Sequence, residues 1–207
     1  MDHRLTELLY SRRARAALVA DEWAALGLDP DELEAAAALV RQQLLDRRHR
    51  GTGGLVDWYP RTLAAWRALH PDDAALDGLA AAFLESTFTA AWREGPSGPA
   101  GLCLEEAFYR FAAASALGEP AVLVDEWLTA QLRALALCPD PRFTIPAELH
   151  AAPAGGWFVV TDAPVLYAAV RGRFLRGTVT PAIAAALRGG PTDPALQEAL
   201  RALGLRS

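Results

Sequence analysis

The spacing of apolar residues changes once along this chain, at Pro139-Asp140-Pro141. Before this point apolar side chains recur every three or four residues, which is the period of a helix with one buried face. After it, short runs of aromatic and β-branched residues lie between Gly and Pro turns, a pattern typical of strands. The sequence therefore predicts an α+β fold, with an all-helical bundle over residues 1–140 and a small β-sheet plus helices module over residues 141–207.

Start and stop signals divide the first part into successive helices. Residues 4–26 are predicted to form one helix that ends at Gly27, a residue that commonly follows a helix. Asp29-Pro30 supplies an N-cap and a first-turn proline for a second helix, which runs to about His49. Later helices are predicted to begin near Asp57 or Tyr59, at Pro71-Asp72-Asp73 (running on toward Phe88 and Trp92), near Leu104 and at Glu119-Pro120.

The second part predicts three strands followed by two short helices. The strands are expected over residues 157–161, 165–170 and 174–179, and the helices over residues 180–187 and 193–203. Thr180-Pro181 and Asp193-Pro194 are N-cap and first-turn pairs that mark the helix starts. This order of elements resembles a winged-helix-like module.

Charge also divides the chain into two parts. Residues 1–141 contain 13 arginines against 21 acidic residues, a net charge of −8, whereas residues 142–207 contain 7 arginines against 4 acidic residues, a net charge of +3. Such asymmetry indicates two parts with different partners. No apolar run approaches the ~20 residues of a membrane helix, and the first residues lack a secretory signal pattern. We therefore expect a cytoplasmic protein with no membrane partner.

Catalytic and metal-binding patterns are weak in this sequence. None of the four histidines lies three or four residues from another His or Cys, so no metal pair projects from one helix face. Cys103 and Cys138 fit buried, reduced thiols. The pair Asp125 and Glu126 fits the first turns of a helix, or one carboxylate buried beside an arginine from another helix. A small α-helical enzyme that uses Asp125, Glu126 or Tyr109 is a further possibility.

The second part contains two features that suggest binding. Arg171 and Arg173 flank a glycine between two predicted strands, and Arg176 follows, so they are either solvated turn residues or a surface for anions or acidic peptides. Trp157 and Phe158 are neighbours, which places their side chains on opposite faces of a strand. Only one of them can face the module's own core. The other packs against the helical part or against a partner.

Several segments together resemble the partner subunits of multinuclear non-heme iron-dependent oxidases, such as the companion protein in methanobactin biosynthesis. The segments are Tyr59-Pro60-Arg61-Thr62, Phe83-Leu84, residues 103–111, Asp125-Glu126-Trp127-Leu128, Phe143-Thr144-Ile145-Pro146, Gly156-Trp157-Phe158-Val159-Val160, residues 164–168 and residues 172–181. The resemblance implies a non-catalytic subunit that forms a heterodimer with an iron-dependent oxidase. It also implies that this subunit binds the leader of a ribosomally made precursor peptide. In this reading the iron belongs to the partner enzyme, and the chain holds no cofactor.

The same resemblance suggests where the peptide binds. The leader would add as another strand at an edge of the sheet, and the sequence leaves open which edge is free. The residues that the resemblance assigns to peptide binding are Trp157, Phe158, Val159, Val160, Leu166, Tyr167, Ala168, Arg171, Arg173 and Arg176. The alternative is a winged-helix-type DNA-binding regulator. Nucleic acid is the weaker expectation, because the positive charge is modest and the helix over residues 180–187 offers few side chains that read bases.

Overall fold

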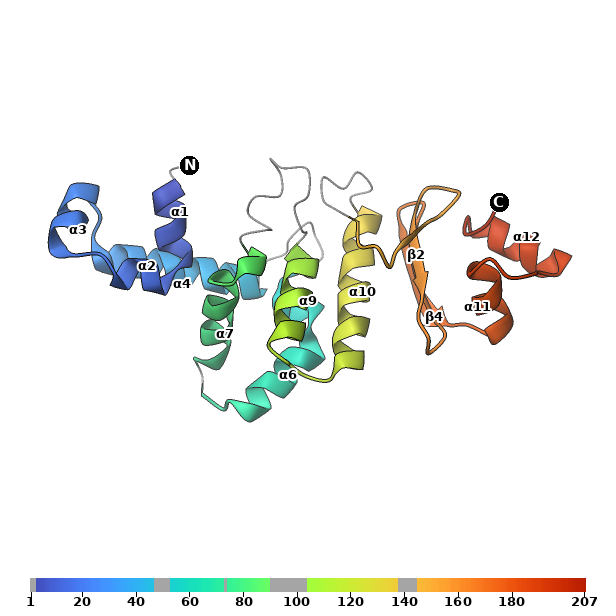
Figure 1. The fold of residues 1–207 in the computed structure, drawn as a ribbon, viewed down its shortest axis with the longest axis horizontal. Coiled ribbons are helices and arrows are strands. Elements are labelled where there is room, and N and C mark those ends of the chain that lie inside the picture. The colour runs from blue at the N-terminus through green and yellow to red at the C-terminus, as the bar shows by residue number, and fades with distance from the viewer. Residues whose placement is uncertain (1–2, 47–52, 73, 90–103, 138–144) are drawn as a thin grey trace.

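The computed structural model describes residues 3–46, 53–72, 74–89, 104–137 and 145–207, and within them the chain has an α+β fold. Helices of the first part are followed by a four-stranded antiparallel sheet and two further helices. In Figure 1 the sheet is seen nearly edge-on, between α10 on one side and α11 with α12 on the other. Cys103 and Cys138 lie outside the described residues.

The N-terminal segment forms three helices instead of the single predicted one, so that prediction is wrong. These helices are α1 (His3–Tyr10), α2 (Arg12–Ala16) and α3 (Ala20–Leu26). Ser11 interrupts the first run, because its backbone is extended and its hydroxyl accepts a hydrogen bond from the Ala14 N–H. Val19 is extended as well and precedes α3. Gly27 ends α3 in the left-handed conformation, as predicted.

The remaining helices of the first part follow the predicted order, except that the four-residue α5 was not predicted as a separate helix. They are α4 (Pro30–Asp46), α5 (Leu55–Trp58), α6 (Pro60–Leu69), α7 (Ala75–Leu84), α9 (Leu104–Ala114) and α10 (Pro120–Leu137). The helix that begins after Pro71 stops earlier than expected, at Leu84. There the Ser86 hydroxyl donates a hydrogen bond of 2.7 Å to the Phe83 carbonyl, which competes with continuation of the helix.

The largest core surrounds Phe108 of α9. Its ring lies 4.7 Å from the ring of Tyr59 and 5.2 Å from that of Phe83, both of which are fully buried. Helix α10 extends this core toward the sheet, because Leu128 and Leu132 belong to the same buried cluster as Tyr167. The helical part and the sheet are therefore joined by one continuous core.

The sheet is an antiparallel meander in the order β1-β2-β3-β4. Its strands are β1 (His150–Ala151), β2 (Gly156–Val160), β3 (Val165–Val170) and β4 (Arg173–Thr178), followed by α11 (Pro181–Leu187) and α12 (Pro194–Ala202). Three strands agree with the prediction to within one residue at each end, and the two-residue β1 was not predicted. Arg171 and Gly172 both have positive φ, 53° and 71°, which fits the two-residue type I′ turn that joins β3 to β4.

Both faces of the sheet are covered. Tyr167 and Ala169 face α10, whereas Ala168 and Val170 face the other way and pack with Leu187 and Leu200 of the last two helices. The two neighbouring aromatic residues follow this alternation: Trp157 packs against the cluster that contains α10, and Phe158 belongs to the cluster beneath α11 and α12. Only the edges of the sheet remain for another chain.

Candidate functional site

Within the residues that the structure describes, the outer edge of β4 is an open edge of the sheet. Because the type I′ turn closes on the pair Val170 and Arg173, that pair exchanges hydrogen bonds, and the next pair along the ladder does not. This alternation leaves Phe174, Arg176 and Thr178 in pairs without ladder hydrogen bonds. Their N–H and C=O groups therefore point away from β3, and in the described part of the chain no strand lies beyond them.

At the opposite side of the sheet the outermost strand is the two-residue β1, which is too short to offer a long edge to a further strand. β1 pairs with Phe158 and Trp157 of β2. Beyond β1, the guanidinium group of Arg188 donates hydrogen bonds of 3.3 Å to the Val160 carbonyl and 2.8 Å to the Thr161 carbonyl. Edge groups that are paired or covered in this way are poor templates for a further strand.

A cleft of about 380 Å³ lies beside β4. Helix α10 supplies four of its lining residues, the α5–α6 junction four, and β4 one. The lining residues are Asp57, Trp58, Pro60, Arg61, Asp125, Glu126, Thr129, Arg133 and Arg176. Asp125, Thr129 and Arg133 are spaced four residues apart, so they share one face of α10.

Glu126 of α10 is a buried carboxylate that caps the N-terminus of another helix, α6. Its side chain is 4% exposed and accepts hydrogen bonds from the Arg61 N–H at 2.6 Å and the Thr62 N–H at 3.2 Å, in the first turn of α6. Tyr59, the residue before α6, provides no side-chain cap. Glu126 therefore satisfies N–H groups that would otherwise lack acceptors. This arrangement matches the expectation of a carboxylate buried beside an arginine from another helix.

The Asp125 carboxylate connects α10 to β3 through Tyr167 and to β4 through Arg176. It accepts a hydrogen bond from the Tyr167 hydroxyl and ion-pairs with Arg176 at 2.6 Å and with Arg61. Burial alone would raise the pKa of Asp125, but the bonds from Tyr167, Arg176 and Arg61 outweigh it and hold that pKa below its usual value. Burial, together with the neighbouring Asp125 carboxylate, raises the pKa of Tyr167 to about 12.

The predicted peptide-binding residues are distributed over both faces of the sheet. Four have buried side chains, three others are partly exposed and the three arginines are exposed; the buried ones are Phe158, Leu166, Tyr167 and Ala168. Arg173 lies on the face toward α12, and Arg176 lies on the face toward α10. Arg171 lies in the turn, where it donates to the Ala202 carbonyl at the end of α12. Of the predicted residues, only Arg176 lines the cleft.

Sequence reasoning missed the helical side of this site. Arg133 and Thr129 were not predicted, although their spacing from Asp125 on one face of α10 was a detectable signal. Arg61 was named only as part of Tyr59-Pro60-Arg61-Thr62, one of the segments that resemble the oxidase partner subunits, and not as a site residue. Tyr109, considered as a catalytic residue with Asp125 and Glu126, does not line this cleft. Its ring stacks on that of Trp127 at 4.2 Å, between α9 and α10.

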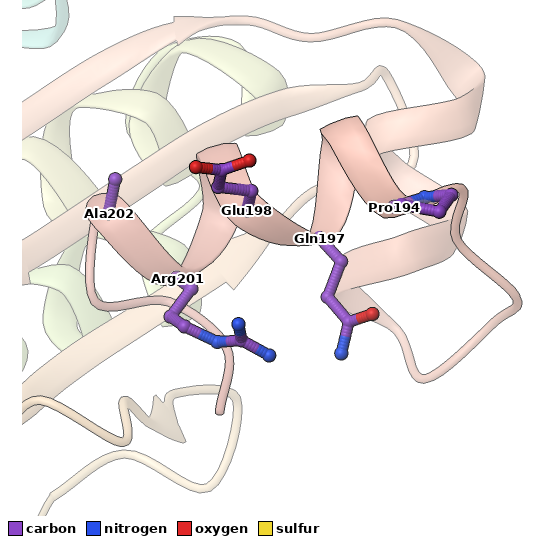
Figure 2. A pocket seen from close by; sticks show the side chains of 5 residues that line it. All are labelled: Pro194, Gln197, Glu198, Arg201 and Ala202. Atoms are coloured by element: carbon purple, nitrogen blue, oxygen red, sulfur yellow. The ribbon is translucent and has the colours of Figure 1, made fainter.

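A second hollow lies on the outer surface of α12. Figure 2 shows that Gln197 and Arg201 project to the same side of this helix, while Glu198 projects to another. Pro194 and Ala202 complete the lining. Among the described residues, no three His, Cys, Asp or Glu side chains come together as a group that could hold a metal ion.

Comparisons of the chain with protein-family models, with curated proteins and with solved structures find no match. In the residues that the structure describes, no helix has both the length and the apolar character needed to cross a membrane.

Proposed function

We propose that this chain is a non-catalytic partner subunit that binds the leader of a ribosomally made precursor peptide and presents it to an iron-dependent oxidase. In this proposal the leader adds to the sheet as a strand along β4. The iron and the oxidation chemistry belong to the partner enzyme. The module formed by β2, β3, β4, α11 and α12 acts as a winged-helix-like, peptide-recognition unit in the cytoplasm.

The observation that carries the proposal is the open edge of β4. Phe174, Arg176 and Thr178 direct their backbone groups outward beside a cleft, and both faces of the sheet are covered by helices. A peptide that pairs with the outward N–H and C=O groups gains affinity that does not depend on its sequence. Side chains of the peptide that enter the cleft would then provide selectivity.

Co-expression tests this function. The full chain is expressed with any iron-dependent oxidase and short precursor peptide that are encoded by genes beside its own, and the mixture is separated by size exclusion. We expect the three chains to elute together, and the iron to stay with the oxidase when the subunits are separated. Elution of this chain alone, in the presence of both others, contradicts the proposal.

The alternative is a winged-helix-type DNA-binding regulator. Helix α11 contains mainly alanine, and α12 carries the acidic Glu198 three residues before Arg201. These side chains offer little for reading bases or for neutralising phosphates. Salt-dependent binding of the full chain to duplex DNA would favour this alternative over the peptide-binding function.

A further inference from the structure

The cleft beside β4 contains an arginine, Arg133, that pairs with none of the carboxylates in its lining. The carboxylates in the lining are each engaged. Glu126 accepts from the first turn of α6, Asp57 accepts from the Gly54 N–H at 3.3 Å, and Asp125 binds two arginines and a tyrosine. Arg133, in contrast, has no carboxylate of the described residues within ion-pair distance.

The position of Arg133 is fixed by an aromatic contact. Its guanidinium carbon lies 5.6 Å from the centre of the Phe174 ring, which is a cation–π distance. Phe174 lies on β4, and its ring faces α10. The contact therefore places the charge of Arg133, a residue of the cleft lining, beside Phe174 of β4.

A strand added to β4 would bring one of its side chains to this charge. Phe174 is one of the residues whose backbone groups point outward, so it can pair directly with an incoming chain. Side chains of paired residues lie on the same face, with Cβ atoms about 5 Å apart. The residue that pairs with Phe174 would therefore point toward α10 and lie beside Arg133.

We infer that the peptide bound along β4 carries an aspartate or glutamate beside Phe174, and that its carboxylate pairs with Arg133. This inference rests on the proposed function and names a requirement of its substrate. The guanidinium fork binds both oxygens of a carboxylate. The cleft lining contains three carboxylates against three arginines, so a singly charged carboxylate suits it better than a phosphate group with nearly two negative charges.

A specificity exchange tests the inference. A display library of short random peptides is selected in parallel on the full wild-type chain and on the full-length variant Arg133→Glu. The wild type should enrich Asp or Glu at one position, and the variant should enrich Lys or Arg at that same position. Arg67→Glu serves as the matched control, because Arg67 is an exposed arginine of α6 outside the cleft, and its selected peptides should match those of the wild type.

Affinity measurements complete the test. For a peptide selected by the wild type, Arg133→Gln should weaken binding about tenfold, as expected for loss of one charge-assisted pair. For the same peptide with its acidic residue changed to Ala, Arg133→Gln should change binding less than about twofold. Equal losses for the two peptides would overturn the pairing.

The two proposals fail in different ways. Selected peptides that lose affinity in the β4 variant Thr178→Pro, but have no enriched acid, overturn the role of Arg133 and leave the peptide-binding function intact. Peptides unaffected by that β4 variant, or no selected peptides at all, overturn both. An unchanged acid preference in Arg133→Glu also overturns the role of Arg133.

Discussion

The two edges of the sheet differ in whether their backbone groups already have partners within the chain. On the β2 side, β1 pairs with the strand and Arg188 covers the carbonyls of Val160 and Thr161. On the β4 side, arginine side chains lie next to the strand but bond to α10 or stack on an aromatic ring. Arg176 pairs with Asp125, and Arg133 lies over Phe174.

This difference shows how the same residue type can close one edge and leave another open. Arg188 donates to backbone carbonyls, so it uses groups that a new strand would need. Arg176 donates to a carboxylate, so its own backbone N–H and C=O remain directed outward. An exposed edge of this kind is normally protected in proteins, and under the proposed function the bound peptide would cover it.

The largest expected loss of stability comes from Gly156→Ala, at the start of β2. An added Cβ would lie 1.9 Å from the Ala169 carbonyl oxygen, at a backbone φ of +106° that favours glycine. We expect a loss of about 3 kcal/mol in unfolding free energy, or roughly 10 °C in thermal midpoint. Gly155→Ala is the matched control: it also has positive φ but meets no atom within 4 Å, so about 1 kcal/mol is expected. Equal losses in the two variants would mean that the close contact at Gly156 is not what matters.

A smaller loss of stability is expected from Glu126→Ala, which affects the contact between α10 and the first turn of α6. The change leaves the N–H groups of Arg61 and Thr62 without their acceptor and empties a buried site. We expect about 2 kcal/mol of destabilisation in chemical unfolding. Glu126→Gln keeps one acceptor oxygen and should lose about half as much. If both variants unfold like the wild type, Glu126 does not act as the cap of α6.

The open edge itself is tested by proline. Thr178→Pro removes an outward N–H and places a ring on the outer side of β4, so capture of a peptide selected by the wild type should weaken about tenfold. Val160→Pro removes an outward N–H on the other edge and should leave peptide affinity within about twofold of the wild type. Binding is measured by fluorescence polarisation with both full-length variants. The reverse order of losses would move the peptide site to the β2 edge.

Local patterns predicted the elements of this fold well, and tertiary contacts explain what they missed. Alternating apolar residues and Gly-Pro turns located β2, β3 and β4, and the pairs Thr180-Pro181 and Asp193-Pro194 located the last helices. The break at Ser11 was missed because it depends on one side-chain hydrogen bond within an otherwise helical composition.

The site was harder to predict because its residues come from distant parts of the chain. Asp125 was singled out, but its contacts with Arg61 and Tyr167 span 64 and 42 residues. The neighbours Trp157 and Phe158 were predicted to face opposite sides, and they do. That the sheet would be covered on both faces follows only from the packing of α10 against it. The free edge could not be chosen before β1 and Arg188 were located.

The smallest expected effect is on the pH dependence of stability. It distinguishes the carboxylate contacts beside β4 from the backbone contacts of Arg188. The folded-state pKa of Asp125 is lowered, so its contribution to stability is present above the pKa of an unfolded aspartate, about 3.9. That contribution is lost as the pH falls through the folded value. Between pH 6 and pH 3, Asp125→Asn should therefore lose less stability than the wild type, by up to about 1 kcal/mol in chemical unfolding. Glu106 has a pKa raised by burial and acts in the opposite direction, but it is present in both proteins and cancels from the difference.

Arg188 also lies 3.8 Å from the fully exposed carboxylate of Asp162, an ion pair that water screens. Its contacts with backbone carbonyls have no titrating acceptor, so an Arg188→Ala variant should show nearly the same pH dependence as the wild type. An Asp125→Asn curve parallel to that of the wild type would mean that the carboxylate does not hold Arg176 and Tyr167 in place. The two edges would then no longer differ in this respect, because acid would loosen neither of them.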